Sequence, residues 1–210
     1  MIKVLMVDDH AILREGIKQI LEEYSDIEYA GEASYGQQAM DLISKNDYDV
    51  VLLDISLPGR SGLEIITQIK NEKPKLPILI LSMHPEERYA VRAFKAGAAG
   101  YLTKVSAPDE LINAIRKVAS GRKFVSNSLA EALASYLDSD GDKAPHEKLS
   151  DREFQVMNML ASGKTVTQIA EELSLSVTTI STHRAHILEK MNMTNNAEIT
   201  YYAFKYGLVD

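Results

Sequence analysis

The chain has no cysteine, no long apolar run and no excess of positive charge, and each absence excludes a class of protein. Without cysteine there are no disulfides and no thiolate metal sites, which agrees with a reducing compartment. No stretch approaches the roughly 20 apolar residues that a membrane-spanning helix needs, and the first residues, Met1–Val4, show no signal-peptide pattern. We therefore expect a soluble, cytoplasmic protein with no membrane partner.

The bulk composition limits how the chain can bind nucleic acid and how many domains it holds. A net charge of -7 leaves no overall basic surface, so nucleic-acid binding has to come from a local patch. The composition, 45% hydrophobic and 25% charged, is that of an ordinary globular protein. A length of 210 residues favours one mid-sized domain plus a small one.

The first part of the chain alternates short apolar runs with helical periodicity. Apolar residues recur at helical spacing between the runs, as at Leu111, Ile115 and Val118. The expected strands are Ile2–Val7, Ile27–Ala33, Val50–Leu53, Ile78–Ser82 and Gly100–Leu102. Five β-α units of this kind predict an α/β fold, with a five-stranded parallel doubly wound sheet covered by helices on both faces.

A polar stretch separates this domain from the rest. Ser135–Lys148 contains Ser-Asp-Gly-Asp and Pro145, which makes it the best linker candidate. We place the first domain at 1–122, a linker with a short helix at 123–147, and a second domain at 148–210. The helix in the linker would carry Leu129, Ala132, Leu133, Tyr136 and Leu137. The second domain has no convincing strand and is predicted to be a smaller, all-α, four-helix domain.

Three acids and one amine stand where the expected strands end. Asp8 and Asp9 follow the first strand, Asp54 follows the third and Lys104 follows the fifth. The carboxyl ends of parallel strands form the usual site crevice of an open α/β sheet. Carboxylates held close together repel, and Mg2+ relieves that repulsion by oxygen coordination, which leaves one acid able to attack phosphorus. A single Asp here would be better explained as a helix cap, but the whole constellation would not.

These motifs resemble the receiver domain of bacterial two-component response regulators, which is flavodoxin-like. The resemblance is carried by Val7-Asp8-Asp9-His10, Leu52–Gly59, Leu81-Ser82-Met83 and Ala96–Lys104, in this order. It implies that Asp54 accepts a phosphoryl group from a sensor histidine kinase. It also implies that Asp8, Asp9 and Asp54, with the backbone carbonyl of Ser56, hold Mg2+.

The companions of the acids have chemical roles of their own. An ammonium such as Lys104 can neutralise the phosphoryl oxygens opposite a metal ion. Ser82 is placed to donate its hydroxyl to a phosphoryl oxygen, and a swing of Tyr101 would follow, as in the switch of such receivers. Pro58-Gly59 gives a tight turn after Asp54. His10 is interpreted as a surface histidine that opens the first helix.

The second domain begins with a recognisable helix start and contains a helix-turn-helix pattern. Ser150 and Glu153 have the spacing of a capping box. Two further helices, about Thr165 to Leu173 and about Val177 to Met191, flank the short turn Ser174-Leu175-Ser176. A helix, a three-residue turn and a longer helix is the arrangement whose second helix enters the DNA major groove. The segment resembles the LuxR-type output domain of the NarL/FixJ class of response regulators.

The long helix of this pattern divides into an inner and an outer face. Ile180, Ile187 and Met191 share a face that we expect to pack inward. The resemblance puts base-reading positions on the opposite face, where hydroxyls and a methyl group can meet base edges. Basic side chains are better suited to phosphates. The expected base-side residues are Thr178, Ser181, Thr182 and Ala185, and the expected phosphate contacts are Lys164, Arg184, His186 and Lys190.

The DNA-binding domain is not basic overall, and its last helix is rich in tyrosine. Residues 148–210 contain six Lys or Arg against seven Asp or Glu, so affinity should depend on dimerisation. The helix from about Asn196 to Tyr206 carries more aromatic surface than a three-turn helix needs. We therefore expect a homodimer through a receiver face, through this helix, or both, with Tyr202 and Tyr206 at the contact.

The sequence predicts a transcriptional regulator that is activated by Mg2+-dependent phosphorylation of Asp54 and acts as a dimer on double-stranded DNA. It would not be a turnover enzyme, beyond slow loss of its own phosphoryl group. One alternative is a phosphotransferase or phosphatase with an aspartyl-phosphate intermediate, although no P-loop and no second catalytic acid is visible. Another is a helix-turn-helix that binds protein, which the near-neutral second domain leaves open.

Overall fold

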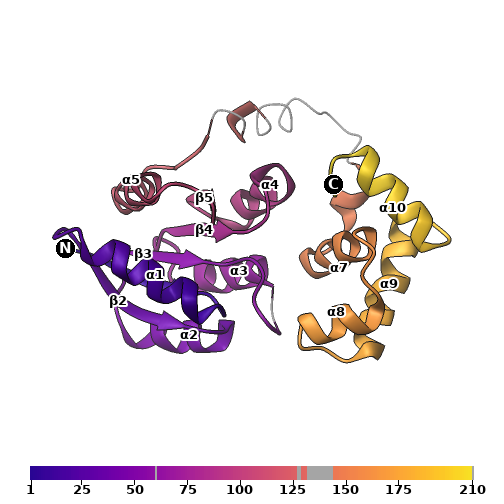
Figure 1. Cartoon of the computed structure of the whole chain (residues 1–210), viewed down its shortest axis with the longest axis horizontal. Coiled ribbons are helices and arrows are strands. Elements are labelled where there is room, and N and C mark those ends of the chain that lie inside the picture. The colour runs from indigo at the N-terminus through magenta and orange to yellow at the C-terminus, as the bar shows by residue number, and fades with distance from the viewer. Residues whose placement is uncertain (60, 127–128, 132–143, 210) are drawn as a thin grey trace. The chain divides into compact units, whose positions relative to one another are not determined.

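A computed structural model of the chain describes residues 1–59, 61–126, 129–131 and 144–209, apart from the side chain of residue 87. The chain divides into two compact units, Met1–Ala134 and Ser135–Asp210 (Figure 1). Each unit has its own buried apolar residues. The two units are therefore described one at a time.

A five-stranded parallel sheet forms the centre of the first unit (Figure 1). The strands lie in the order β2-β1-β3-β4-β5, and every neighbouring pair is parallel. Their bounds are β1 Ile2–Val7, β2 Ile27–Ala33, β3 Val50–Leu53, β4 Ile78–Ser82 and β5 Gly100–Thr103. The expected α/β sheet is confirmed, with the last strand one residue longer than the apolar run indicated.

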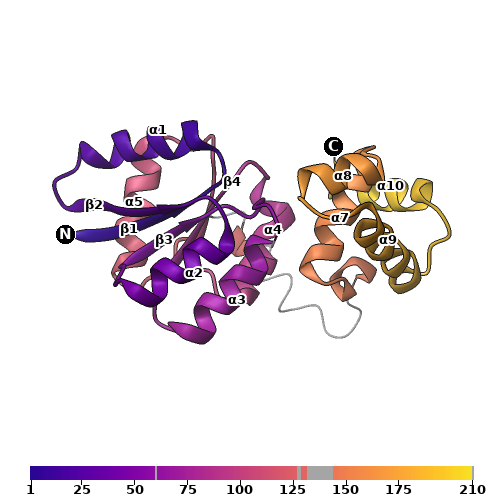
Figure 2. The same cartoon turned by 90° about the horizontal axis from the view of Figure 1, so that it is seen from below.

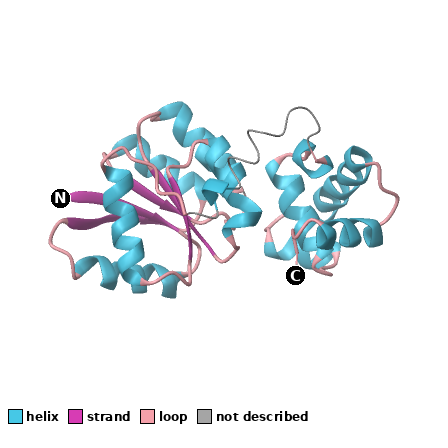
Figure 3. Ribbon diagram, turned by 90° about the horizontal axis from the view of Figure 1, so that it is seen from above, coloured by secondary structure: helices cyan, strands magenta, loops and turns pink. Residues whose placement is uncertain are grey.

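Five helices cover both faces of this sheet (Figures 2 and 3). They are α1 Ala11–Glu22, α2 Gly36–Lys45, α3 Gly62–Glu72, α4 Glu86–Ala96 and α5 Pro108–Ala119. Helices α1 and α5 lie on one face, and α2, α3 and α4 lie on the other (Figure 2). The predicted doubly wound arrangement is therefore present.

The alternation of side chains along each strand explains why two helical layers are needed. Val4 and Met6 of β1 pack in one apolar cluster with Ile17 and Leu21 of α1 and Leu111 of α5. The residues between them point to the opposite face of the sheet, because successive side chains of a strand alternate. Leu5 and Val7 are completely buried as well. Strands that are apolar on both faces remain stable only when both faces are covered.

The described part of the second unit, residues 144–209, contains helices and no strand. Its elements are the 3-10 helix η1 Pro145–Lys148 and the helices α7 Asp151–Ala161, α8 Val166–Glu172, α9 Val177–Met191 and α10 Asn196–Lys205. Ser150 begins α7 with the expected capping box, in which its backbone N–H donates to Glu153 across 2.8 Å. Ser176 begins α9 by accepting a hydrogen bond from the Thr179 N–H at 3.0 Å. Local capping thus fixes where the helices start.

Helices α8 and α9 form the predicted helix-turn-helix. Ser174 lies in the turn between them with a φ of 52°, and Asn192 ends α9 with a φ of 54°, both in the left-handed region. Ile180, Ile187 and Met191 of α9 are buried, as the periodicity indicated, together with Phe154 of α7 and Ile199 of α10. These side chains form the small core that fixes the angle between the two helices.

The end of the predicted linker belongs to the second unit. Residues 145–148 form η1, and the ring of His146 packs against Phe154 and Tyr202. The linker is therefore shorter at its C-terminal end than the polar composition suggested. Of the short helix expected before it, 129–131 is helical, and residues 132–143 lie outside the described part of the chain. Among the described residues, no helix is both long and apolar enough to cross a membrane.

Candidate functional site

Two of the predicted acids meet because their strands are neighbours in register. Val7 of β1 pairs with Leu53 of β3, so that Asp8 and Asp54 follow at the same level of the sheet edge. The Asp54 N–H donates to the Val7 carbonyl at 2.9 Å, and the Asp8 N–H donates to the Ala33 carbonyl at 3.0 Å. The pairing of the strands continues past their ends and fixes both carboxylates.

Lys104 reaches these acids from β5. Its ammonium lies 2.6 Å from Asp8 Oδ2 and 2.7 Å from Asp54 Oδ2. Both contacts are ion pairs, and the one with Asp54 is also a well-directed hydrogen bond. The Lys104 N–H donates to the Ser82 carbonyl at 2.8 Å, which holds the backbone of this residue to β4. The structure thus brings together three residues that lie far apart in the sequence.

The cluster holds more negative than positive charge in a buried place. Asp8 is 0% exposed and Asp54 is 1% exposed. Burial raises the pKa of Asp54, and the nearby Asp8 adds to this, while the Lys104 ammonium acts in the opposite direction. Burial alone would lower the pKa of Lys104, but the two carboxylates outweigh it, and this pKa lies above its ordinary value. One ammonium therefore serves two buried carboxyl groups, and an added cation would be favoured there.

The residues fit a small divalent cation. Ligand atoms of Asp8, Asp9, His10 and Asp54 all lie within 4.8 Å of one another. Asp9 stands at the rim with its side chain 36% exposed, which leaves a way in from solvent. Carboxylate oxygens are the ligands that Mg2+ prefers, and the two buried carboxyl groups of Asp8 and Asp54 share a single ammonium, that of Lys104, within the described part of the chain. The donor set is consistent with the predicted Mg2+ site.

The loop after Asp54 stays close to the site. The Ser56 N–H donates to Asp54 Oδ1 at 3.1 Å, which holds the residue whose carbonyl is expected at the metal. Gly62, at the start of α3, approaches so closely that a Cβ there would lie 2.4 Å from the Asp54 carbonyl oxygen. Gly59 has a φ of 78°, as a tight turn after Pro58 requires. Glycine is thus needed at two points for this loop to fold over the site.

Ser82 and Tyr101 lie beside the cluster and are joined through His84. Ser82 is 0% exposed, and its hydroxyl accepts a hydrogen bond from the His84 N–H at 3.2 Å. Tyr101 is 2% exposed and donates its hydroxyl to the His84 carbonyl at 2.9 Å. The His84 imidazole Nε2 lies 3.3 Å from the Ser56 hydroxyl. The two predicted switch residues therefore share one neighbour.

The sequence patterns did not identify His84 or Arg14 as residues of the site, and they did not predict that His10 contacts the acids. Arg14 donates from Nη1 to the Asp8 carbonyl at 2.8 Å, and His10 Nδ1 lies 3.0 Å from Asp8 Oδ1 and 2.9 Å from Asp9 Oδ1. The His10 side chain is 64% exposed, so it is a surface residue as expected, but one that faces the acids. Arg14 lies six residues after Asp8 and His84 lies two residues after Ser82. This closeness in the sequence was the signal that could have identified both residues.

The predicted base-reading residues lie on the outer face of α9. Thr178, Ser181, Thr182 and Ala185 are all exposed, opposite the buried Ile180 and Ile187. The Thr182 hydroxyl donates to the Thr178 carbonyl at 3.0 Å within the helix, which leaves its methyl group and oxygen lone pairs outward. These four residues are small and uncharged, as base-edge contacts need, and the exposed Glu189 one turn after Ala185 brings a negative charge to the same face.

The predicted phosphate contacts are mostly engaged inside the domain. Lys190 pairs with the buried Glu153 at 2.7 Å, and Arg184 donates from Nε to Asn196 Oδ1 at 2.6 Å. Lys164 pairs with Glu172. His186 has a side chain that is 52% exposed, with Nδ1 3.7 Å from Glu153. Lys190 and Arg184 thus have structural partners that the sequence alone did not reveal.

The proposed self-association residues on α10 need a correction. Tyr202 is only 9% exposed, and its hydroxyl lies 2.8 Å from His146 Nδ1, so it packs within the domain and leaves little surface for a partner. Tyr206 stacks on it at a ring distance of 4.4 Å and is 47% exposed. The most exposed aromatics are Tyr201 at 70% and Phe204 at 69%. An outward aromatic face is present; it includes the expected Tyr206, together with Tyr201 and Phe204 in place of Tyr202.

Comparison with known proteins agrees with both halves of this description. Residues 4–116 match the family described as Response regulator receiver domain, and residues 147–203 match Bacterial regulatory proteins, luxR family. Response regulator UvrY of Escherichia coli (strain K12) is 39% identical over 209 residues, which cover 99% of this chain and 96% of that protein. Response regulator GacA of Pseudomonas aeruginosa is 35% identical over 212 residues, covering 100% and 99%.

Solved structures show the same architecture. A structure of RcsB from Salmonella enterica serovar Typhimurium, bound to promoter rprA in the presence of the phosphomimetic BeF3-, is 26% identical with a TM-score of 0.65. The match covers 96% of this chain and 98% of that one. The sheet, the helix-turn-helix and these relatives agree, and the chain belongs to the two-component response regulators of the NarL/FixJ class, with a receiver domain and a LuxR-type DNA-binding domain.

Proposed function

We propose that Asp54 accepts a phosphoryl group from a partner histidine kinase in a Mg2+-dependent reaction, and that this modification controls DNA binding by a dimer. The observation that carries the proposal is the buried group of Asp8, Asp54 and Lys104 at the end of neighbouring parallel strands. Membership of the response regulators supports the same reading.

The chemistry follows from the positions of the side chains. A carboxylate oxygen of Asp54 attacks phosphorus, a P–O bond forms, the P–N bond of the phosphohistidine breaks, and the donor imidazole leaves with the electron pair. Lys104, already within 2.7 Å of Asp54, is positioned to neutralise a phosphoryl oxygen. A bound Mg2+ supplies positive charge to the remaining oxygens. Asp8 and Asp9 would hold that ion, and Arg14 holds the backbone of Asp8 in place.

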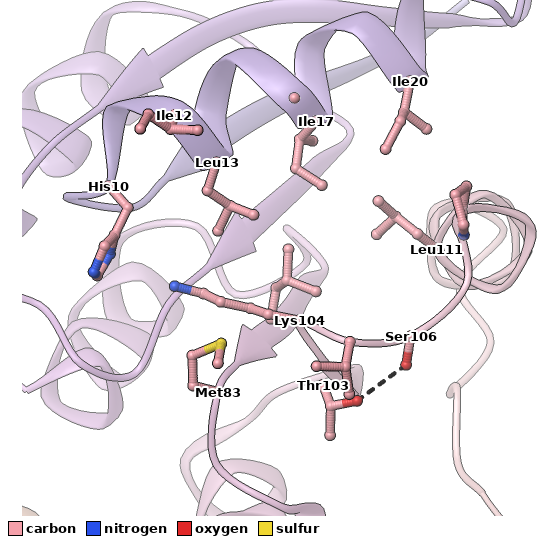
Figure 4. A pocket seen from close by; sticks show the side chains of 14 residues that line it. His10, Ile12, Leu13, Ile17, Ile20, Met83, Thr103, Lys104, Ser106 and Leu111 are labelled. Carbon is pink, nitrogen blue, oxygen red and sulfur yellow. Dashed lines mark hydrogen bonds between the residues drawn. The ribbon is translucent and has the colours of Figure 1, made fainter.

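An apolar groove beside the acids is a suitable place for the kinase to bind. It has a volume of about 660 Å³ and lies between α1 and the loop after β5 (Figure 4). Ile12 is 91% exposed, Val105 81% and Met83 67%, an unusual density of exposed apolar side chains. Lys104, which contacts Asp54, is one of the residues that line the groove, so a helix docked there would bring its histidine close to Asp54.

Labelling with a small phosphodonor tests the phosphoacceptor. Acetyl phosphate with Mg2+ is expected to label the wild-type chain to about one phosphoryl group per molecule. Asp54→Asn should abolish labelling, and Asp47→Asn, a change at a fully exposed acid of the same unit, should leave it intact. Persistent labelling of Asp54→Asn would reject the nucleophile. Many turnovers per molecule, in place of one slow cycle, would favour the enzyme interpretation.

The outer face of α9 is proposed to read DNA bases. Ser181 and Thr182 offer hydroxyls, and Ala185 offers a methyl group, so substitutions there should change which base pairs are preferred, where one mismatched base pair costs about 1–3 kcal/mol. Lys164→Met should instead weaken binding to all sequences and reduce the salt dependence by about one phosphate contact. Selection of bound genomic fragments with Ser181→Ala, with Ser44→Ala at an exposed serine of the first unit as the control, tests this. Unchanged preferences would reject the assignment.

Dimerisation on DNA is proposed to use the exposed aromatic face of α10. Tyr201 and Phe204 are three residues apart and lie on one side of the helix, with Tyr206 nearby. Two copies would double the number of phosphate contacts, which a domain without excess positive charge needs. Phosphorylation would then act by shifting the monomer–dimer equilibrium.

A further inference from the structure

His10 faces the acid cluster with a nitrogen that can bind metal. It stands directly before α1, and its Nδ1 lies 3.0 Å from Asp8 Oδ1 and 2.9 Å from Asp9 Oδ1. The backbone around it is fixed, since its N–H donates to Asp8 Oδ1 at 2.8 Å and its carbonyl accepts from the Arg14 N–H at 3.1 Å. Only rotation of the side chain is needed to bring the ring toward or away from the acids.

The spacing of these atoms is close to that of ligands on a tetrahedral ion. Two such ligands, each about 2.1 Å from the metal, lie roughly 3.4 Å apart. Nδ1 lies 3.0 Å and 2.9 Å from the two carboxylate oxygens, slightly closer than this. The ligand atoms of Asp8, Asp9, His10 and Asp54 lie within 4.8 Å of one another, so the exposed Asp9 and His10 would have to move inward to complete the shell.

The chemical type of the ligand atom determines which metal ion the site binds more tightly. Mg2+ takes oxygen ligands and keeps several waters, so an imidazole adds little to its binding. Zn2+ binds imidazole nitrogen strongly and is held by four ligands when a site is closed. We propose that His10 supplies a nitrogen ligand that lets this site bind Zn2+ through Asp8, Asp9, His10 and Asp54, in competition with Mg2+. The inference rests on the proposed cation site.

A closed zinc shell would block the phosphoacceptor. Four protein ligands fill the tetrahedral positions of Zn2+, so no position is left for a phosphoryl oxygen. The same arrangement engages the carboxylate of Asp54, which must be free to attack phosphorus. The receiver would then respond to two cations in opposite ways, with Mg2+ permitting modification and Zn2+ preventing it.

Zinc and magnesium titrations of the untagged full-length chain test the proposal. Loss of a direct ligand costs at least as much as loss of an outer partner, which is about 10–100-fold in metal affinity. His10→Ala should therefore weaken Zn2+ binding by about tenfold or more and leave Mg2+ binding within about twofold. His186→Ala removes another half-exposed imidazole and should leave Zn2+ binding at this site unchanged. Addition of Mg2+ should displace Zn2+ competitively.

Two further readouts separate the possible results. In the wild-type chain, the NMR signal of His10 Nδ1 should show direct coordination to Zn2+, whereas Mg2+ should only weaken the contacts of the ring with Asp8 and Asp9. Zn2+ should suppress labelling by acetyl phosphate in the presence of Mg2+, and His10→Ala should need about tenfold more Zn2+ for the same effect. Equal Zn2+ affinity of wild-type and His10→Ala chains would overturn the inference and leave the phosphoacceptor intact. Failure of the wild-type chain to bind Mg2+ or to be labelled would instead reject the proposed function.

Discussion

The hydroxyl of Tyr101 donates a hydrogen bond to the backbone carbonyl of His84 across 2.9 Å, and this contact joins β5 to the loop that follows β4. The same histidine donates its N–H to Ser82 and lies beside the Ser56 hydroxyl. A change at Asp54 that draws Ser82 toward it would therefore move His84 and release Tyr101. The proposed switch is a hydrogen-bonded chain in which each member constrains the next.

Tyr101→Phe tests that chain by removing one hydroxyl. The His84 carbonyl loses a donor in a buried place, so we expect the free energy of unfolding of the receiver to fall by about 1 kcal/mol. Labelling at Asp54 should persist, because the hydroxyl does not touch the acids. Urea unfolding followed by circular dichroism measures the change, and Tyr35→Phe, at a tyrosine that is 51% exposed, serves as the control. Equal effects of both substitutions would show that the contact with His84 has no special importance.

Lys104→Met tests how the buried carboxylates are neutralised. Removing one partner of a buried ion pair costs about 3–5 kcal/mol, because the other charge is left uncompensated. We expect a loss of this size in metal-free buffer and a partial recovery in Mg2+, which replaces the missing positive charge. Lys75→Met, at an exposed lysine of the same unit, is the matched control. A variant as stable as wild type without metal would mean that Asp8 and Asp54 are neutralised in another way.

The elements of the first unit could be predicted from the sequence because its strands are short and buried on both faces. Continuous apolar runs such as Val50–Leu53 have no other common explanation between amphipathic helices. The positions of Asp8 and Asp54 followed, since parallel strands end at one edge of a sheet. Lys104 could be placed at that edge, but its distances to both acids depend on the register of β4 and β5.

The second unit shows where sequence patterns stop being sufficient. The capping box at Ser150 could be predicted from local spacing, but the partner of Glu153 at Lys190 lies 37 residues away. A lysine on an exposed helix face was therefore interpreted as a phosphate contact. Tyr202 was misplaced for a related reason. The residue that covers it, His146, comes from a segment whose composition indicated a linker.

The pair of Glu153 and Lys190 predicts a loss of stability in acid. Burial of Glu153 acts to raise its pKa, but Lys190 and the hydrogen bonds from Ser150 outweigh this, and the pKa lies below its ordinary value of 4.5. A carboxyl group with a lowered pKa in the folded state stabilises the fold above the pKa of the unfolded chain. This contribution is lost as the pH falls through the lower, folded pKa.

Glu153→Gln measures that contribution. At pH 7 we expect the second unit to lose about 2 kcal/mol, since hydrogen bonds to a charged group are replaced by neutral ones. The difference between wild type and variant should narrow as the pH falls below about 4.5, because the wild-type carboxyl group becomes protonated. Unfolding of both proteins across this pH range, with Glu171→Gln at an exposed acid as the control, provides the test. A difference that stays constant with pH would contradict the assigned pairing.

Phe204→Ser tests the proposed dimer face of α10. Phe204 is 69% exposed and has little effect on the core, so the substitution should leave the fold intact. If the ring is central to the contact, the dimer on DNA should weaken by about 2 kcal/mol, or roughly thirtyfold. Tyr202→Phe is the informative comparison, because it removes a hydroxyl that bonds His146 inside the domain and should leave dimerisation unchanged. Mobility shifts on a two-fold DNA site, with protein concentration varied, measure dimer formation by both variants. Loss of the dimer in Tyr202→Phe but not in Phe204→Ser would show that Phe204 is not part of the dimer contact.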